Sequence, residues 1–194
     1  MQYPVDLSFK LISLGPQIAA TDATGRLVFF VKQKAFRLKE QVTVFADREQ
    51  SRPLYTIAAD RILDFSARYH FRDAGGASLG SIKRQGLRSL WRSRYDVLEG
   101  ETVVADIREE NPWIKVADGV FEAIPLLGML SGYLFHPSFL VSRADGTVLL
   151  RLTKRPAFFE GRFQVERVSD MGEAEENRAL LSVLMMLLIE RGKG

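Results

Sequence analysis

The segment that most constrains the fold is an apolar stretch near the end of the chain, Ala179–Ile189, in which Ser182 is the one polar residue. It follows the acidic turn AEEN and precedes Glu190 and Arg191, so we predict a helix that is apolar on every face. Such a helix must be buried on all sides, in protein or in lipid. Eleven residues at 1.5 Å each give about 16 Å, roughly half the hydrocarbon thickness of a bilayer. The surroundings are therefore expected to be protein.

Much of the remaining chain alternates apolar and polar residues with the period of a half-buried strand. In WRSRYDV, Trp91, Tyr95 and Val97 fall on one side and charged residues on the other; QVTVFAD and GRFQVERV repeat this pattern. Turn residues divide these runs into about twelve short strands. A barrel of about eight strands is filled by its own side chains, so a wall that encloses a helix needs more. We therefore predict a mainly β (α+β) fold: a closed antiparallel β-barrel of about twelve strands around the buried C-terminal helix.

One phrase occurs three times: DATGRLVFFVKQKAF from Asp22, DAGGASLGSIKRQG from Asp73 and DGTVLLRLTKRPAFF from Asp145. In each, an aspartate that can hydrogen-bond its own turn stands before a glycine that tolerates positive φ, which predicts a chain reversal. A strand follows each reversal and ends in cations. The predicted strands are Leu27–Val31, Leu79–Ile82 and Val148–Leu152, and the closing cations are Lys32 with Lys34, Lys83 with Arg84, and Lys154 with Arg155. Solvated strand ends that discourage edge pairing would explain such cations without a ligand.

Two further segments depart from the strand pattern. NPWIKVADGVFEAIP begins with Asn111 as N-cap and Pro112 at the first helical position, and its apolar stripe predicts one amphipathic surface helix that ends at Pro125. The uncharged run Leu126–Phe135 follows it and is too short to span a bilayer. With 194 residues, 46% of them hydrophobic, and no low-complexity block, residues 1–194 are interpreted as a single domain.

The strand-and-turn pattern resembles that of the tubby C-terminal-like superfamily. DATGRLVFFVKQKAFRLKEQVTVFADREQSRPLYTI is similar to the opening of LURP-one-related proteins, and HPSFLVSRADGTVLLRLTKRPAFFEGRFQVERV to the part of phospholipid scramblases before their terminal helix. The resemblance implies a barrel of about twelve strands around a hydrophobic C-terminal helix. It also implies lipid contact, because tubby domains bind phosphoinositide head groups through surface cations and scramblases are anchored in membranes. The proline-rich leader, palmitoylated cysteines and anchor helix of scramblases have no counterpart in these letters.

A cation cluster suggests where such contact would occur. KRQGLRSLWRSR holds Lys83, Arg84, Arg88, Arg92 and Arg94, with Trp91 among them and no acid. Cations beside an exposed aromatic can bind anionic lipid, each contributing about 1 kcal/mol near a charged membrane. Alternatively Trp91 faces the core and the arginines coat a strand, pairing with acids such as Glu99 or Asp106. The formal net charge of +3 is too mild to indicate a nucleic-acid partner.

Signals for catalysis, metals and cofactors are missing from the sequence. The chain has no cysteine, its two histidines, His70 and His136, lack metal-ligand spacing, and neither a nucleophile elbow nor a phosphate loop occurs. No signal peptide or membrane span is predicted at the N-terminus, which suits a cytoplasmic protein, peripheral to the membrane if it binds lipid. We therefore expect a non-enzymatic binding module for anionic phospholipid head groups. The alternative is a soluble regulatory or scaffold domain that binds another protein through Leu126–Phe135.

Overall fold

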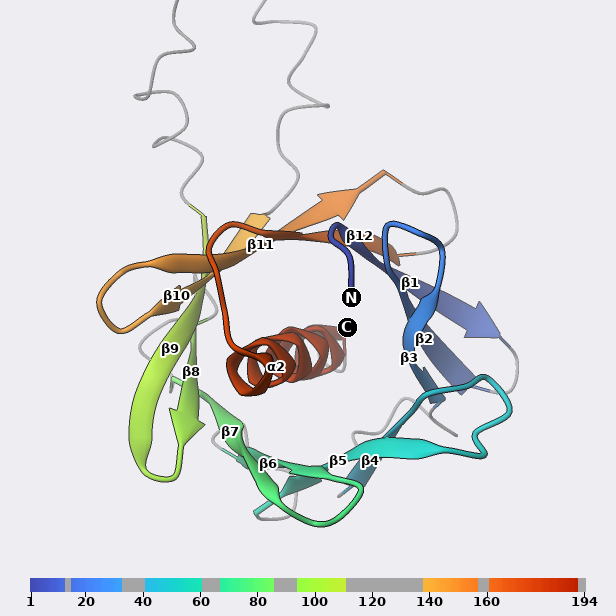
Figure 1. Ribbon diagram of the computed structural model, residues 1–194, viewed down its shortest axis with the longest axis horizontal. Coiled ribbons are helices and arrows are strands. Elements are labelled where there is room, and N and C mark those ends of the chain that lie inside the picture. Colours follow the sequence, from blue (N-terminus) through green and yellow to red (C-terminus); the bar gives the residue numbers. More distant parts are fainter. Residues whose placement is uncertain are drawn as a thin grey trace, which may run out of the picture.

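A computed structural model of the chain describes residues 1–12, 15–32, 41–60, 67–85, 94–110, 138–156 and 161–191. Within these ranges twelve strands form one closed barrel around one helix (Figure 1). The elements are β1 (Val5–Ile12), β2 (Gly15–Thr21), β3 (Leu27–Lys32), β4 (Gln41–Phe45), β5 (Pro53–Ala59), β6 (Arg68–Asp73), β7 (Ser78–Arg84), β8 (Arg94–Glu99), β9 (Thr102–Glu109), β10 (Ser138–Arg143), β11 (Val148–Arg155), β12 (Gly161–Arg167) and α2 (Glu173–Arg191). The predicted barrel of about twelve strands is confirmed. The amphipathic helix expected from Asn111 to Pro125 lies outside the described residues.

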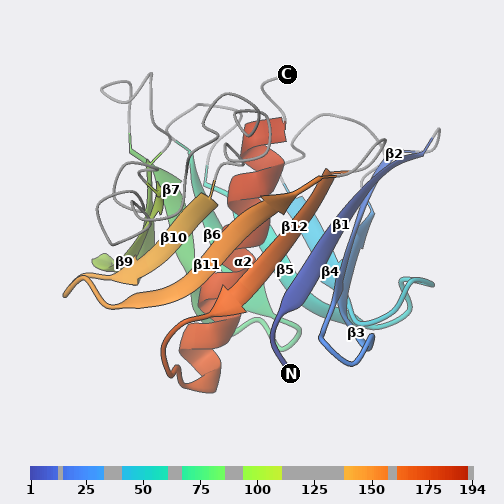
Figure 2. The same cartoon turned by 90° about the horizontal axis from the view of Figure 1, so that it is seen from above.

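Every strand pairs antiparallel with its neighbours in the chain, and β1 closes the wall against β12 from Val5↔Val165 to Phe9↔Gly161. Because the strands alternate in direction, the barrel has two distinct ends. We call the end that holds the turns after β2, β4, β6, β8 and β10, together with the start of α2, the turn end. The opposite end, where α2 finishes at Arg191, is the exit end (Figure 2).

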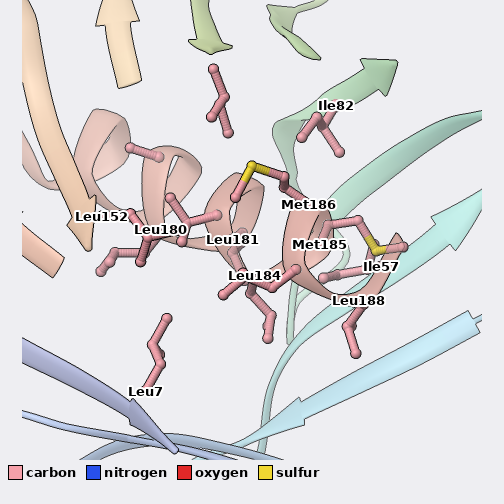
Figure 3. Packing of buried hydrophobic residues seen from close by; sticks show 14 of the residues in the cluster. Leu7, Ile57, Ile82, Leu152, Leu180, Leu181, Leu184, Met185, Met186 and Leu188 are labelled. Carbon is pink, nitrogen blue, oxygen red and sulfur yellow. The ribbon is translucent and has the colours of Figure 1, made fainter. Parts of the chain in front are cut away.

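The helix α2 runs through the interior of the barrel, as the apolar stretch predicts. Every residue from Ala179 to Ile189 is at most 8% exposed, and Leu184 is fully buried. Figure 3 shows side chains leaving the helix on several sides, among wall residues such as Leu7 and Ile82. The buried hydroxyl of Ser182 donates to the carbonyl oxygen of Arg178 at 2.8 Å, so this polar group is satisfied within the helix. Central placement of the helix is confirmed.

The three repeated phrases form the turns of the hairpins β2–β3, β6–β7 and β10–β11, which recur every fourth strand. Gly25, Gly76 and Gly146 have φ of 81°, 87° and 90° at these turns, as expected. The carboxylate of Asp22 accepts hydrogen bonds from the amides of Thr24 and Arg26 at 3.0 and 3.1 Å. The predicted role of aspartate and glycine in the turns is therefore confirmed.

The third turn differs in one respect from the other two. Asp22 and Asp73 donate their backbone N–H across the turn to residues four further on, whereas in the third turn Arg143 does so, to Thr147. Asp145 stands two residues later and accepts from the amide of Thr147 at 2.8 Å. The glycines of the three phrases are thus equivalent, and the third aspartate is not.

Each of the five hairpins at the turn end contains a register shift beside its turn. In the three repeated hairpins it lies between Ala20 and Thr21, between Phe71 and Arg72, and between Val141 and Ser142. The hairpins β4–β5 and β8–β9 have the same irregularity. Bulges of this kind bend a strand and increase its twist, which a sheet needs in order to close.

Polar contacts fix α2 along the barrel axis. Arg178, 8% exposed, donates from Nε to the carbonyl oxygen of Leu79 at 2.7 Å and pairs with Glu99 at 2.7 Å. Nearer the start of the helix, Arg143 donates to both carboxylate oxygens of Glu175 at 2.7 Å each. Bidentate pairs of this type are among the stronger hydrogen-bonded contacts in proteins. They set both the depth of the helix and its rotation.

Gly80 provides the space for this docking. The helix backbone comes closest to β7, and Gly80 there has φ of 120°. A Cβ atom at this position would lie 2.5 Å from the carbonyl oxygen of Leu98 and 2.8 Å from Nε of Arg178. Only glycine therefore lets Arg178 reach the wall.

We expect Leu184→Asp to abolish soluble expression, because a carboxylate at this fully buried position has no partner and costs several kcal/mol. The matched control is Ala174→Asp, at an exposed position in the first turn of the same helix, which should fold normally. The measurement is soluble yield followed by thermal unfolding. A folded Leu184→Asp protein with the melting temperature of the parent would contradict central placement of α2.

Gly80→Ala should lower the melting temperature at least twice as much as Gly25→Ala. Both glycines have positive φ, which costs another residue about 1–3 kcal/mol, but a Cβ meets nothing within 4 Å at Gly25. At Gly80 it also displaces Arg178 or the β8 backbone. Equal losses in the two variants, measured by calorimetry, would show that the approach of the helix does not depend on Gly80.

Candidate anion-binding surface

The five cations singled out in the sequence belong to the connection between β7 and β8. Lys83 and Arg84 end β7 and Arg94 begins β8, so all three lie at the exit end. Lys83 and Arg94 are exposed. Arg88, Arg92 and Trp91 lie outside the described residues, as does the apolar run Leu126–Phe135. The structure thus places two of the five cations together on the outer wall.

Arg84 takes a different position from Lys83 and Arg94. It pairs in register with Tyr95, whose side chain is buried in the barrel, and directly opposed residues share a face of the sheet. Arg84 therefore lies on the inner side, half-buried, and its Nε is buried without a hydrogen-bond partner among the described residues. The hydroxyl of Tyr95 donates to Glu190 near the end of α2. Arg84 accordingly belongs to the mouth of the barrel around the helix end.

Other cations gather at the exit end because β3, β7 and β11 all finish there. Lys32, Lys154 and Arg155, the described closing cations of the first and third phrases, join Lys83 and Arg84 at this end. Arg191 ends α2 there, its guanidinium carbon 4.6 Å from the centre of the Phe9 ring, and burial lowers its pKa. The acids Asp60 and Glu109 share this end, so it is basic but not uniformly so.

Arg108 and Arg151, which the sequence analysis did not single out, lie on the same outer wall as Arg94. Arg94 lies directly opposite Arg108 on β9, Arg108 opposite Leu140 on β10, and Leu140 opposite Arg151 on β11. The four residues form one row across four strands of the outer wall. The alternation of apolar and polar residues in ADIRE already predicts that Arg108 lies on the outer face. That Arg94 lies opposite it follows only from the strand register.

Among the described residues, the acids expected to pair with the arginines form no ion pair with Lys83, Arg84 or Arg94. Glu99 pairs with Arg178. An oxygen of Asp106 lies 3.9 Å from Nε of Arg108, too far for a hydrogen bond. In the described part of the chain neither Lys83 nor Arg94 forms an ion pair.

The turn end holds carboxylates with lowered pKa values. Hydrogen bonds from Thr24 lower the pKa of Asp22, those from the Ser51 amide lower the pKa of Asp47, and those from Thr147 lower the pKa of Asp145. The hydrogen bonds from Arg143 likewise lower the pKa of Glu175. These groups stabilise turns and the helix start and are not arranged as a binding site. Across the described ranges, no three metal-ligating side chains converge.

A closed barrel with a hydrophobic C-terminal helix is the architecture of the tubby-like C-terminal class, to which LURP-one-related domains belong. The chain belongs to the LURP-one-related family, whose family model matches residues 13–123. An X-ray structure of a protein from Arabidopsis thaliana is similar over 97% of this chain and 91% of that one, with 17% identity and a TM-score of 0.49. The comparison with curated proteins gave no match.

The described residues contain no helix whose length and apolar character would let it cross a membrane.

The melting temperature should fall as the pH is lowered from about 5 to 3. Asp22, Asp47, Asp145 and Glu175 have folded pKa values below those of the unfolded chain, so their stabilisation is complete above the unfolded values and is lost as the pH falls through the folded ones. Asp22→Asn keeps an acceptor for the turn amides and removes one titrating group, so its decrease should be smaller. A parental melting temperature that stays constant down to pH 3 would contradict this assignment.

Proposed function

We propose that this domain is a non-enzymatic binding module for anionic phospholipid head groups at a cytoplasmic membrane surface. The observation that carries the proposal is the common position of the cations. Lys83 and Arg94 are exposed at the exit end, on either side of the segment that contains Arg88 and Arg92. Family membership supports a binding role, and the choice of lipid rests on the charge distribution.

The separation of charge along the barrel would orient the domain at a membrane. Exposed Lys154 and Arg155 lie at the exit end, whereas the turns with Asp22, Asp47 and Asp145 lie at the other. The cytoplasmic leaflet is anionic and attracts each nearby cation with about 1 kcal/mol, within a Debye length of about 8 Å. The exit end would therefore face the lipid. Arg84, on the inner side of the mouth, is expected to contribute less than Lys83.

Binding of another protein through Leu126–Phe135 is the alternative prediction. Those residues lie outside the described part of the chain, so the alternative rests on their composition alone. It predicts binding that neither requires anionic lipid nor weakens with salt.

The test is co-sedimentation of the protein with vesicles of phosphatidylcholine alone or with 30% phosphatidylserine, at about 50 and 300 mM salt. Binding should require phosphatidylserine and weaken at high salt. Lys83→Glu with Arg94→Glu should weaken it at least about 25-fold, since each lost cation contributes about 1 kcal/mol. Arg88→Glu with Arg92→Glu should act similarly.

The matched control is Arg52→Glu with Arg72→Glu, which makes the same change in charge at exposed positions of the turn end. It should bind nearly as well as the parent. No binding at low salt, or equal weakening by the control, would refute the proposal.

A further inference from the structure

The outer wall contains two cations directly opposite each other, Arg94 on β8 and Arg108 on β9. The Cβ atoms of directly opposed residues are about 4.5–5.5 Å apart, and like charges at such positions repel. A neighbouring pair makes the arrangement more pronounced, since Asp96 opposes Asp106 on the same two strands. On these two strands each of the two opposed pairs therefore carries charges of one sign, although opposite charges within each pair would have been more favourable.

The guanidinium groups of Arg94 and Arg108 also differ from other arginines in their hydrogen bonds. Arg143, Arg151 and Arg178 are bound to carboxylates at 2.7–3.2 Å. Arg108 approaches Asp106 only to 3.9 Å, and Arg94 has no ion-pair partner among the described residues. Asp96, the acid beside Arg94, instead accepts a hydrogen bond from Gln85 at 2.6 Å. Arg94 and Arg108, directly opposed on the outer wall, therefore keep guanidinium donors available within the described part of the chain.

We infer that Arg94 and Arg108 together hold one phosphate group, and that the group is a monoester. Two planar forks side by side can donate to several oxygens of one anion, and a dianionic monoester offers three terminal oxygens where a diester offers two. Bound phosphate would also offset the repulsion between the arginines. The inference rests on the proposed lipid function and specifies its ligand chemistry: a phosphomonoester head group, bound more tightly than a diester of equal surface charge.

The position of the pair suits such a ligand. Arg94 begins β8 at the exit end, where Lys83 is also exposed, so the phosphate would lie beside the proposed membrane contact. Leu140, half-buried and opposite Arg108 on β10, provides an apolar surface next to the phosphate for the organic part of the ligand. Arg151, beyond Leu140, is held by Glu110 at 3.2 Å and is not available in the same way.

The experiment compares vesicles that contain phosphatidic acid, a monoester, with phosphatidylglycerol vesicles adjusted to the same surface potential. The parent should bind the phosphatidic acid vesicles at least about tenfold more tightly. Arg94→Gln and Arg108→Gln should each weaken that binding about 10- to 100-fold, the range for a lost charge-assisted hydrogen bond. The affinity of the double variant for these vesicles should be within about threefold of that of the weaker-binding single variant, because both arginines hold the same phosphate group.

Lysine variants distinguish hydrogen bonding by the planar guanidinium groups from attraction by positive charge alone. Arg94→Lys and Arg108→Lys keep the charge and lose the planar donors, so they should lose the preference for phosphatidic acid while still binding phosphatidylglycerol. Arg72 is an exposed arginine at the turn end, and Arg72→Gln is the control. It should change neither the preference for phosphatidic acid nor the binding of phosphatidylglycerol. Thermal unfolding of each variant confirms that the outer-wall substitutions leave the fold intact.

A soluble monoester, glycerol 3-phosphate, distinguishes the source of the phosphate. If glycerol 3-phosphate raises the melting temperature of the parent but not of Arg108→Lys, and neither protein binds vesicles, then Arg94 and Arg108 do bind a phosphomonoester and the proposed membrane function is wrong. The joint phosphate site would be overturned, and the lipid function left in place, if the parent bound both vesicle types with equal affinity and the losses of binding in Arg94→Gln and Arg108→Gln added up in the double variant. No effect of any of these ligands would overturn both.

Discussion

The requirement to bury a helix that is apolar on every side determines the rest of this structure. Ala179–Ile189 has no polar face to present to water, and it is too short to cross a bilayer. Twelve antiparallel strands surround it, more than the eight or so that fill their own interior. The helix therefore replaces the side-chain core of a smaller barrel, and leucine and methionine from α2 meet the inward residues of the wall.

Burial alone does not orient a uniformly apolar rod, and the polar contacts supply this orientation. Arg178 reaches the backbone of Leu79 through the space left by Gly80, and Arg143 holds Glu175 at the first turn. These contacts fix the acidic start of α2 at the turn end. Arg191 accordingly lies at the opposite end, where β3, β7 and β11 also finish with their cations. Helix placement and strand direction together therefore produce the charge separation used in the proposed function.

Features that depend on local periodicity could be predicted from the sequence, and those that depend on strand register could not. The buried helix, the strand alternation around Tyr95 and the glycine turns all follow from short patterns. Residues two apart on a strand share a face, so Arg84 belongs on the same inner face as buried Ile82, and the structure has it there. By contrast, the contact of Arg178 with a carbonyl 99 residues away in the chain, and the opposition of Arg94 and Arg108, exist only once the wall has closed.

Native-state hydrogen exchange of the backbone amides tests the central claim most directly. If the barrel is organised around the helix, amides from Leu181 to Leu188 exchange only when the whole domain unfolds, with the same free energy as those of Val97 and Ile107 in the wall. Exchange of the helix amides at a free energy several kcal/mol below that of the wall would mean that the barrel stands without its helix, which contradicts the account.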